Sequence, residues 1–449
     1  MFKNIFYYSK LIILSVFLRK KYDHYQLLND KDYNILIKNI NDCGCICIKC
    51  IQWMIPILEN QNVDENLISK LNNLYHNCTI YHDIEYTKTQ YKKAFYQNIE
   101  QNYDICEIIG SGSIATVYKI KSKKDEKYYV MKIIHPQIKT DIIFFKILLR
   151  IIYNIRYFKN LFYEYFPFDL IEFLEDFYKQ SDFINECNNL IKFKKDYENV
   201  PYIIIPELYK SSQNIIIMEY IEGVCIDDTD ISEYNKSKII NLVYLFIRNN
   251  LDILNNNHGD LHKYNWAVSK DKKDNLHKII IYDFGYCFEL TDEETFYITS
   301  ICKLIINFDK NNDDHIKKYH NFLKYIFDDD TLQLDDTFDH NITKPDILLN
   351  LILKISKRNK IYIKKIKVLN TILLSCLVDN YFNHYNINTN ETISEIRKGQ
   401  LDSHIFCETY NIFPELSQLF FDEYERSKPN DTEGLFESIK FSDKIKSMI

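Results

Sequence analysis

Residues 258–265 read His-Gly-Asp-Leu-His-Lys-Tyr-Asn, and residues 279–285 read Ile-Ile-Ile-Tyr-Asp-Phe-Gly. The first stretch places the carboxylate of Asp260 and the amide of Asn265 in one short loop. The second ends an apolar strand with Asp283 at a glycine turn. A loop aspartate can accept the proton of an attacking hydroxyl, and carboxylate and amide oxygens suit Mg²⁺. We therefore predict a phosphoryl-transfer site with Asp260 as catalytic base and with Asn265 and Asp283 as metal ligands.

Either acidic stretch alone would be explained equally well by a capped turn or a solvated aspartate. The prediction gains weight from two further features upstream. Residues 110–118 read Gly-Ser-Gly-Ser-Ile-Ala-Thr-Val-Tyr between two predicted strands. Two glycines let backbone N–H groups approach phosphate oxygens, although a plain hairpin turn would also contain them. The residues predicted to cover a nucleotide are Gly110, Ser111, Gly112, Ser113, Ala115 and Val117.

The second upstream feature is a lysine on the following strand. Lys132 lies 20 residues after Gly112 and has apolar neighbours, so its charge needs a partner. We predict that Lys132 contacts the α and β phosphates and pairs with a helix glutamate. Glu186, 54 residues further on, is the expected partner, and Glu172 and Glu175 are competing candidates. This gap is longer than in ordinary protein kinases, so residues of about 140 to 180 are expected to be inserted helices.

The order of the predicted elements indicates an α+β fold, bilobed and protein-kinase-like. We expect a helical extension over 1–100, a small β-rich lobe over 101–222 and a large helical lobe over 223–449. After the strand predicted at 215–218, the backbone of Glu219 and Ile221 would meet the adenine edge. An ordinary strand-to-loop transition is the alternative there. Strands are predicted at 103–109, 116–120, 128–134, 203–205, 215–218, 265–269 and 278–282.

Composition excludes several classes of protein. The chain has 449 residues, of which 46% are hydrophobic, and a net charge of −7, which argues against a general nucleic-acid-binding protein. The twelve cysteines form no regular disulfide framework and indicate reduced thiols in an intracellular protein. Alanine occurs at three positions, 94, 115 and 267, and lysine far exceeds arginine, which is typical of an AT-rich genome.

Residues 1–18 are the candidate for membrane contact. The run from Ile5 to Leu18 is apolar except for Lys10, and three basic residues follow at 19–21. It is shorter than the roughly 20 apolar residues that span a bilayer, and no small-residue cleavage site of a signal peptide follows. We weigh peripheral membrane association through an interfacial helix against a helix that docks on the domain behind it.

Four cysteines, Cys43, Cys45, Cys47 and Cys50, lie close together in the extension. Four thiols in such a cluster can bind Zn²⁺. However, Cys43, Cys47 and Cys50 have the spacing of one helix face, so we interpret them as small buried hydrophobic side chains.

Together these motifs resemble the UbiB family, the aarF-domain-containing atypical kinases, over residues from about 40 to about 300. The resemblance is carried by Met131-Lys132-Ile133-Ile134-His135-Pro136, by the helix of 182–193, by the loop of 258–262 and by Asp283-Phe284-Gly285. It implies a kinase-like fold that uses ATP and Mg²⁺ as cofactors. The Lys263-Tyr264 pair replaces the family's Pro-Gly. The glycine loop resembles that of ordinary kinases more than the family's alanine-rich loop.

The family's signature is a Lys-x-Gly-Gln motif in a helical extension. In Ile48-Lys49-Cys50-Ile51-Gln52, Lys49 and Gln52 match this motif, and Ile51 replaces its glycine. The resemblance implies that the extension folds over the active site and occupies the region where a peptide substrate would bind. The family ordinarily has an acidic residue near Asn73, and its loss argues against a regulatory or metal-binding role there.

Three functions are consistent with these features. The leading one is an ATP-binding, Mg²⁺-dependent kinase-like protein that transfers or hydrolyses a phosphoryl group. The first alternative is a small-molecule kinase of the aminoglycoside or choline phosphotransferase type, which lacks the helix of Lys49 and Gln52. The second is a catalytically weak, nucleotide-dependent scaffold, for which an occluded peptide site favours a lipid or isoprenoid ligand.

Overall fold

The structure is a computed structural model of the chain. Residues 1–18, considered above for membrane contact, lie outside the residues that it describes. Within the described part of the chain, no helix combines the length and the apolar character that a membrane crossing would need. The described residues are 29–59, 63–75, 78, 82–155, 166–227, 231–273, 276–309, 311–332, 344–385, 387, 413 and 415.

A five-stranded antiparallel sheet forms the small lobe, with strand order β1-β2-β3-β6-β5. Helix α5 (Ile84–Phe95) contributes Tyr91 to the core of this sheet, beside Tyr118, Met131 and Ile217. The branched and aromatic residues of these strands favour the half-buried pleated surface. The strands are β1 (Tyr103–Ser111), β2 (Ala115–Ser122), β3 (Tyr128–Ile134), β5 (Leu208–Ser211) and β6 (Ile215–Glu219).

The turn between β1 and β2 is shorter than predicted. Gly110 and Ser111 were expected in the turn, but they pair with Val117 and Thr116 as the last residues of β1. Register shifts earlier in β1 absorb extra residues and carry the strand into the glycine loop. The β3 bounds are as predicted.

A second sheet has the order β4-β10-β9-β7 and belongs to the large lobe. Its strands are β4 (Ile203–Ile204), β7 (Gly223–Val224), β9 (Trp266–Lys273) and β10 (Leu276–Ile281). The prediction that placed residues 203–205 with the small lobe is wrong, because β4 pairs in parallel with β10 through Ile279 and Ile280. The strands β8 (Asn257–His258) and β11 (Cys287–Phe288) pair as a short antiparallel ribbon.

The extension comprises α2 (Asp30–Cys43), α3 (Cys45–Glu59), α4 (Glu65–Asn72) and the 3₁₀ turn η1 (Asn73–Tyr75). Gly44, at a φ of 87°, separates α2 from α3. Cys43 therefore does not share a helix with Cys47 and Cys50, and the prediction of one common face is wrong. Cys43 and Cys47 pack in a cluster with Ile40 and Leu71, whereas Cys50 packs against the main core.

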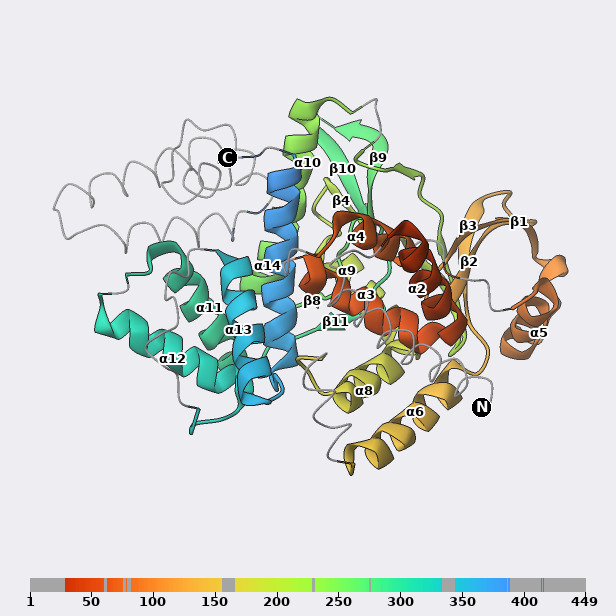
Figure 1. Ribbon diagram of the computed structural model, residues 1–449. Helices are drawn as coiled ribbons and strands as arrows, with labels where there is room; N and C mark the ends of the chain where they lie inside the picture. The colour runs from red at the N-terminus through yellow and green to blue at the C-terminus, as the bar shows by residue number, and fades with distance from the viewer. Residues whose placement is uncertain are drawn as a thin grey trace, which may run out of the picture.

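The large lobe is helical, and its core is continuous with that of the extension. Met54 and Ile57 of α3 pack in the same cluster as Phe177, Leu349 and Ile372. In Figure 1, α2, α3 and α4 lie between the five-stranded sheet and α14. The helices are α6 (Ile138–Tyr153), α8 (Leu170–Gln180), α9 (Phe183–Asp196), α10 (Glu233–Asn249), α11 (Asp292–Asn307), α12 (Asp313–Phe327), α13 (Pro345–Asn359) and α14 (Ile366–His384), with short turns η2 (Ile99–Gln101) and η3 (Asn250–Leu254).

Candidate functional site

Strand β3 carries Lys132 into a buried position where two carboxylates meet its ammonium. The Nζ atom lies 2.8 and 3.0 Å from the two carboxylate oxygens of Glu186 and 3.0 Å from Oδ1 of Asp283. The Lys132 residue is 7% exposed and the Glu186 residue 3%. An ammonium has three donors, so these contacts use all of its hydrogen-bonding capacity.

The competing glutamates lie elsewhere. The carboxylate of Glu172 is 3.8 Å from the ammonium of Lys364, and Glu175 pairs with Lys146. The structure thus brings Lys132 together with Glu186, and in the described parts of the long gap between them, 133–155 and 166–185, lie the helices α6 and α8.

Helix α9 links this ion pair to the loop that carries Asp283. Its first turn is capped by the Asp182 side chain, which accepts a hydrogen bond from the backbone N–H of Ile184. One turn later Glu186 reaches Lys132, and Asn189 donates to the carbonyl of Phe284 at 2.9 Å. One helix therefore orients both the lysine and the loop of residues 283–286, which we call the metal loop after its predicted role.

Asp283 adopts a left-handed backbone conformation, with a φ of 52°. Such a conformation costs energy in a residue with a side chain and is often found at functional sites. The N–H of Gly285 donates to Asp283 Oδ1 at 3.2 Å. A Cβ atom on Gly285 would lie 3.1 Å from that oxygen, so the glycine allows the carboxylate to fold back over the turn.

The loop of residues 258–265, which we call the catalytic loop after its predicted role, is held to the metal loop by hydrogen bonds. Gly259 donates to the carbonyl of Tyr286 at 2.8 Å, and Tyr282 donates to the carbonyl of Asn265 at 2.8 Å. A Cβ atom at Gly259 would lie 2.6 Å from the Tyr286 ring, so this position needs a glycine. His258 also bridges the loops, because its Nε2 atom lies 3.1 Å from the carbonyl oxygen of Tyr282.

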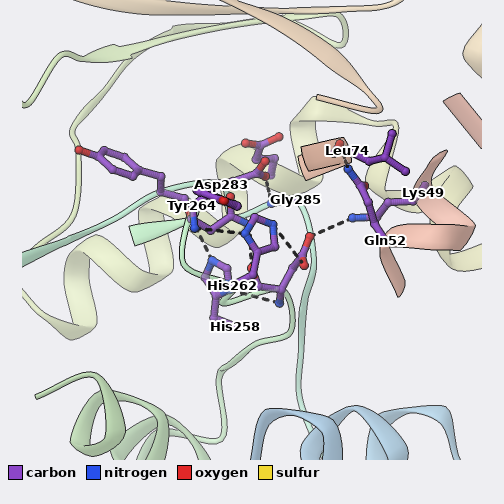
Figure 2. A network of polar contacts seen from close by, with 12 residues as sticks. Lys49, Gln52, Leu74, His258, His262, Tyr264, Asp283 and Gly285 are labelled. Atoms are coloured by element: carbon purple, nitrogen blue, oxygen red, sulfur yellow. Dashed lines mark hydrogen bonds and ion pairs between the residues drawn. The ribbon is translucent and has the colours of Figure 1, made fainter. Parts of the chain in front are cut away.

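The extension reaches this site through Lys49. Its Nζ atom lies 2.9 Å from Oδ2 of Asp260, and the two side chains are 10% and 29% exposed. Gln52, one turn further along α3, donates to the carbonyl of Leu74 at 2.8 Å and so fixes η1 against α3. Figure 2 shows Lys49 directed toward the loop of His258 and His262, whereas Tyr264 points to the opposite side.

The charges of the site follow from burial and from close partners. Burial works against ionisation of Asp260, but the Lys49 ammonium outweighs it and lowers the pKa of that carboxyl. Burial lowers the pKa of His262 to about 4, although Asp260 opposes this shift. Burial raises the pKa of Glu186 to about 7 against the influence of Lys132. At neutral pH, Asp260 is therefore an anion beside a neutral His262.

Asp283, Asn265 and Asp260 supply oxygen atoms within one small region. The amide nitrogen of Asn265 donates to the carbonyl of Asp260 at 2.7 Å, and its carbonyl oxygen is the atom that a divalent cation would take. The Asp283 side chain is 44% exposed despite its contact with Lys132. Among the described residues, no three His, Cys, Asp or Glu side chains are arranged to hold a metal alone. This donor set fits Mg²⁺, which takes one or two protein ligands and completes its shell with phosphates and water.

The glycine loop leads into β2, which lies beside the strand that carries Lys132, since Val117 and Lys132 are paired neighbours. Within the loop, the N–H of Gly112 donates to the carbonyl of Ala115 at 2.9 Å. The buried hydroxyl of Ser111 has no hydrogen-bond partner among the described residues. A buried hydroxyl without a partner is uncommon in proteins, which fits a loop that a ligand completes.

The predicted hinge residues are held by neighbouring backbone and side-chain groups. The Glu219 N–H donates to the carbonyl of Glu207 at 2.8 Å. The Ile221 carbonyl accepts a hydrogen bond from the Tyr282 hydroxyl at 3.2 Å. Tyr282 precedes Asp283, so the hinge and the metal loop are joined by one residue.

A cavity of about 540 Å³ lies between the extension and the catalytic loop. Within it, the amide of Asn72 donates to the Glu59 carboxylate at 3.1 Å. Polar side chains predominate in its lining. The lining residues are Glu59, Val63, Glu65, Ile68, Ser69, Asn72, Asn73, Lys263 and Tyr264.

Some residues of the site were not identified from the sequence. Asn189 lies in a motif that was recognised, but its contact with the Phe284 carbonyl crosses between elements and leaves no local signal. The roles of Tyr282 and Tyr286 are also tertiary, because each joins loops that are separate in sequence. By contrast, the glycines at 259 and 285 are visible in the two motifs, and the structure supplies the steric reason for each.

Comparison with known proteins gives a consistent result. The family model of the ABC1 atypical kinase-like domain matches residues 76–320. "Probable protein kinase UbiB" of Cronobacter sakazakii is 28% identical over 232 residues, 48% of this chain and 41% of that protein. AarF domain-containing kinase 1 of Drosophila melanogaster is 25% identical over 218 residues, 45% and 40% of the two chains. A chloroplastic Arabidopsis thaliana protein, ACTIVITY OF BC1 COMPLEX KINASE 7, is 31% identical over 123 residues, 25% and 16% of the two chains. The chain thus spans less than half the length of these relatives.

Proposed function

The chain belongs to the ABC1 atypical kinase-like family, and on this premise we propose that it binds ATP with Mg²⁺ and transfers or hydrolyses the terminal phosphoryl group. The observation that carries this proposal is the meeting of Lys132 with Glu186 and Asp283, which lie 54 and 151 residues away in sequence. On nucleotide binding, a phosphate oxygen would take the place of Asp283 at this ammonium, and Asp283 would then be available to the metal. The same function is supported by the combination of a β-rich lobe with a helical lobe and by the order of the motifs along the chain.

The side chains would divide the work as follows. Lys132, oriented by Glu186, would hold the α and β phosphates, and Asp283 and Asn265 would hold Mg²⁺. The metal, when bound, neutralises charge that develops on the phosphate oxygens. Asp260 would orient the acceptor hydroxyl or water and take its proton, since its lowered pKa keeps it ionised. Catalysis of this kind depends mainly on positioning and on electrostatics.

The nucleotide would lie between the glycine loop and the hinge. The loop of Gly110–Ala115 would present backbone N–H groups to the phosphates. At the hinge, the Ile221 carbonyl and the Glu219 N–H already have partners. The Glu219 carbonyl and the Ile221 N–H are therefore the backbone groups that we assign to the adenine edge.

The extension restricts what can receive the phosphoryl group. Because Lys49 contacts Asp260, a peptide has no direct approach to the proposed base. Water or a small molecule is thus the acceptor that the site supports best. A small hydrogen-bonding acceptor is favoured specifically by the polar cavity beside Lys263 and Tyr264.

Three further proposals rest on the family resemblance and on the free thiols. We propose an intracellular location, because the eleven described cysteines are all free thiols. A lipid or isoprenoid ligand and peripheral membrane association through residues 1–18 are proposed from the resemblance and from the sequence of that segment. ATPase measurements with and without liposomes would test the last two.

The proposed function is tested by nucleotide binding with and without Mg²⁺ and by ATP turnover. Asp283→Asn keeps the shape of the side chain and removes its charge, so we expect it to lose Mg²⁺-dependent turnover while keeping the fold. Glu172→Gln, at a carboxylate paired outside the site, is the matched control. Undiminished Mg²⁺-dependent ATP hydrolysis in purified Asp283→Asn protein would refute the assignment.

A further inference from the structure

Two buried histidines lie behind the glycine loop and have no part in the proposed chemistry. His135 is 1% exposed and follows Lys132 by three residues, whereas His82 is 9% exposed and precedes α5. Their Nδ1 atoms lie 3.3 Å apart. Polar rings packed this closely need a defined arrangement of protons, because a buried polar group without a partner is costly.

His135 holds the glycine loop by two contacts. Its backbone N–H donates to the carbonyl of Ile114 at 2.8 Å, and its Nε2 atom lies 2.9 Å from the carbonyl oxygen of Gly112. A carbonyl oxygen can only accept, so Nε2 must carry the hydrogen. In a neutral imidazole, Nδ1 of His135 is then an acceptor.

This assignment determines the protons of the whole chain of groups. The Nδ1 atom of His82 must donate to His135, which leaves Nε2 of His82 as an acceptor. The Tyr118 hydroxyl, 3.5 Å from that Nε2 atom, completes the order as a donor, and it lies 3.0 Å from the hydroxyl of Thr87. A relay thus runs from Tyr118 through His82 and His135 to Gly112.

A second proton on His135 would break the relay, because two N–H groups would then face each other at the 3.3 Å contact. A second proton on His82 would instead face the Tyr118 hydroxyl, which would have to turn and accept rather than donate. The surroundings favour the neutral rings. Burial and, to a smaller extent, the neighbouring His82 lower the pKa of His135 to about 4, against the opposing effect of the contact with the Gly112 carbonyl. Burial also lowers the pKa of His82 against the opposing charge of Asp83. Among the described residues, the rings of Tyr118 and Tyr86 also face His82, the latter with its ring centroid 4.8 Å from that of His82.

The relay controls the direction of a peptide group in the loop. In a trans peptide the carbonyl and the following N–H point in opposite directions. With the Gly112 carbonyl held toward His135, the N–H of Ser113 is turned away from that ring. Glycine at position 112 offers little resistance to a peptide flip, so the imidazole supplies the restraint that the residue itself lacks.

We propose that His135 is a positioning residue of the nucleotide site, which fixes the Gly112–Ser113 peptide through a neutral relay with His82 and Tyr118. The nucleotide part of this inference rests on the function proposed above. His82 precedes α5, so the relay also ties the orientation of the phosphate loop to the N-terminal part of the chain. Its expected kinetic signature is a change in KM for ATP larger than the change in kcat, since His135 does not touch the reacting groups.

The test compares two substitutions at one position. His135→Gln retains an N–H donor for the Gly112 carbonyl, whereas His135→Phe fills the volume without a donor. We expect the Phe variant to raise KM for MgATP about tenfold, the worth of a hydrogen bond of roughly 1.4 kcal/mol. The Gln variant should restore most of the affinity. His277→Phe, at a buried histidine of β10, is the control and should leave KM unchanged.

Two results would overturn the inference while the proposed function stands: an unchanged KM in His135→Phe, or equal impairment of the Phe and Gln variants. The second would show that the ring acts through packing. A ¹⁵N spectrum of the imidazoles in the nucleotide-free protein tests the relay without any activity. We expect His135 to stay neutral and protonated at Nε2 at pH 6, and a charged ring there would refute the relay. Loss of MgATP binding in the wild-type protein would refute the proposed function, and with it the nucleotide role of His135.

Discussion

The Nζ atom of Lys49 lies 2.9 Å from the Oδ2 atom of Asp260, although 211 residues separate the two in sequence. This contact joins the helical extension to the residue that we propose as the catalytic base. The ammonium is also a principal cause of the lowered pKa of Asp260, which burial alone would raise. The extension therefore influences the charge of the site.

Replacing Lys49 with Met should raise the pKa of Asp260, because the stabilising cation is lost and burial remains. The acid limb of the pH–rate profile for ATP turnover should then move to higher pH. Lys70→Met is the control, since Lys70 pairs with Asp30 on the surface of the extension, at 2.9 Å. An acid limb that stays in place in Lys49→Met would show that this ammonium does not set the ionisation of Asp260.

Removing Glu186 should destabilise the fold as well as the site. Glu186→Ala leaves the buried ammonium of Lys132 with Asp283 as its remaining carboxylate partner, and breaking a buried pair costs roughly 3 kcal/mol. Glu172→Ala, which breaks a half-exposed pair, should cost about 1 kcal/mol or less. Urea unfolding of the three proteins measures both free energies. Equal losses in the two variants would show that the buried pair of Lys132 and Glu186 stabilises the fold no more than the half-exposed pair of Glu172.

Alanine at the two motif glycines should have different effects. At Gly259 the new Cβ atom would lie 2.6 Å from the ring of Tyr286, which is half-buried against the core, and we expect a loss of about 1–3 kcal/mol in stability. At Gly285 the nearest atom is the Asp283 carboxylate oxygen, 3.1 Å away, which a small rotation can relieve. Gly285→Ala should therefore lower Mg²⁺ affinity with little change in the unfolding midpoint. A loss of stability in Gly285→Ala together with an unchanged stability in Gly259→Ala would contradict this steric argument.

Stability should fall as the pH is lowered from 7 to 4. Burial lowers the pKa values of four histidines below the usual 6.5, so the unfolded chain binds protons in this window that the native protein does not. Burial raises the pKa of Glu186 to about 7 and that of Asp379 to about 6, and these two groups act in the opposite direction. The histidines are more numerous, so the net effect is a loss of stability in acid. The four histidines are His82, His135, His258 and His262.

Urea midpoints measured at pH 7, 6 and 5 would show this loss. The His135→Gln variant should show a weaker dependence on pH than the wild type, because it removes one of the titrating rings. A midpoint that rises steadily on acidification would mean that the carboxyl groups dominate.

Much of the site could be predicted from the sequence, because its residues occur in short motifs with fixed spacing. The partnership of Lys132 with Glu186 could be predicted because a charge on an apolar strand demands a counter-charge. The bounds of β3 followed from a run of residues typical of strands. In each case the signal was local, or the chemistry left few choices.

The failures have a common physical origin in tertiary contacts. The strand β4 is a short apolar run, and the residues Ile203–Ile204 carry no signal that its partner strand is β10. The break at Gly44 was missed because a single glycine is compatible with a helix interior, and its φ of 87° is set by the packing of α2 on α3. The family resemblance implied that the extension folds over the active site, but the contact of Lys49 with Asp260 was not predicted, since no local pattern joins the two residues.

The core shared by the extension and the large lobe holds α3 in place. Trp53, on α3, packs edge-on against Phe168 with ring centroids 4.2 Å apart, and Met54 and Ile57 lie in the same apolar cluster as α13 and α14. Peeling α3 away would expose this interior to water, at a cost comparable to partial unfolding. The contact of Lys49 with Asp260 therefore depends on this packing, and we expect it to persist as long as the shared core stays folded.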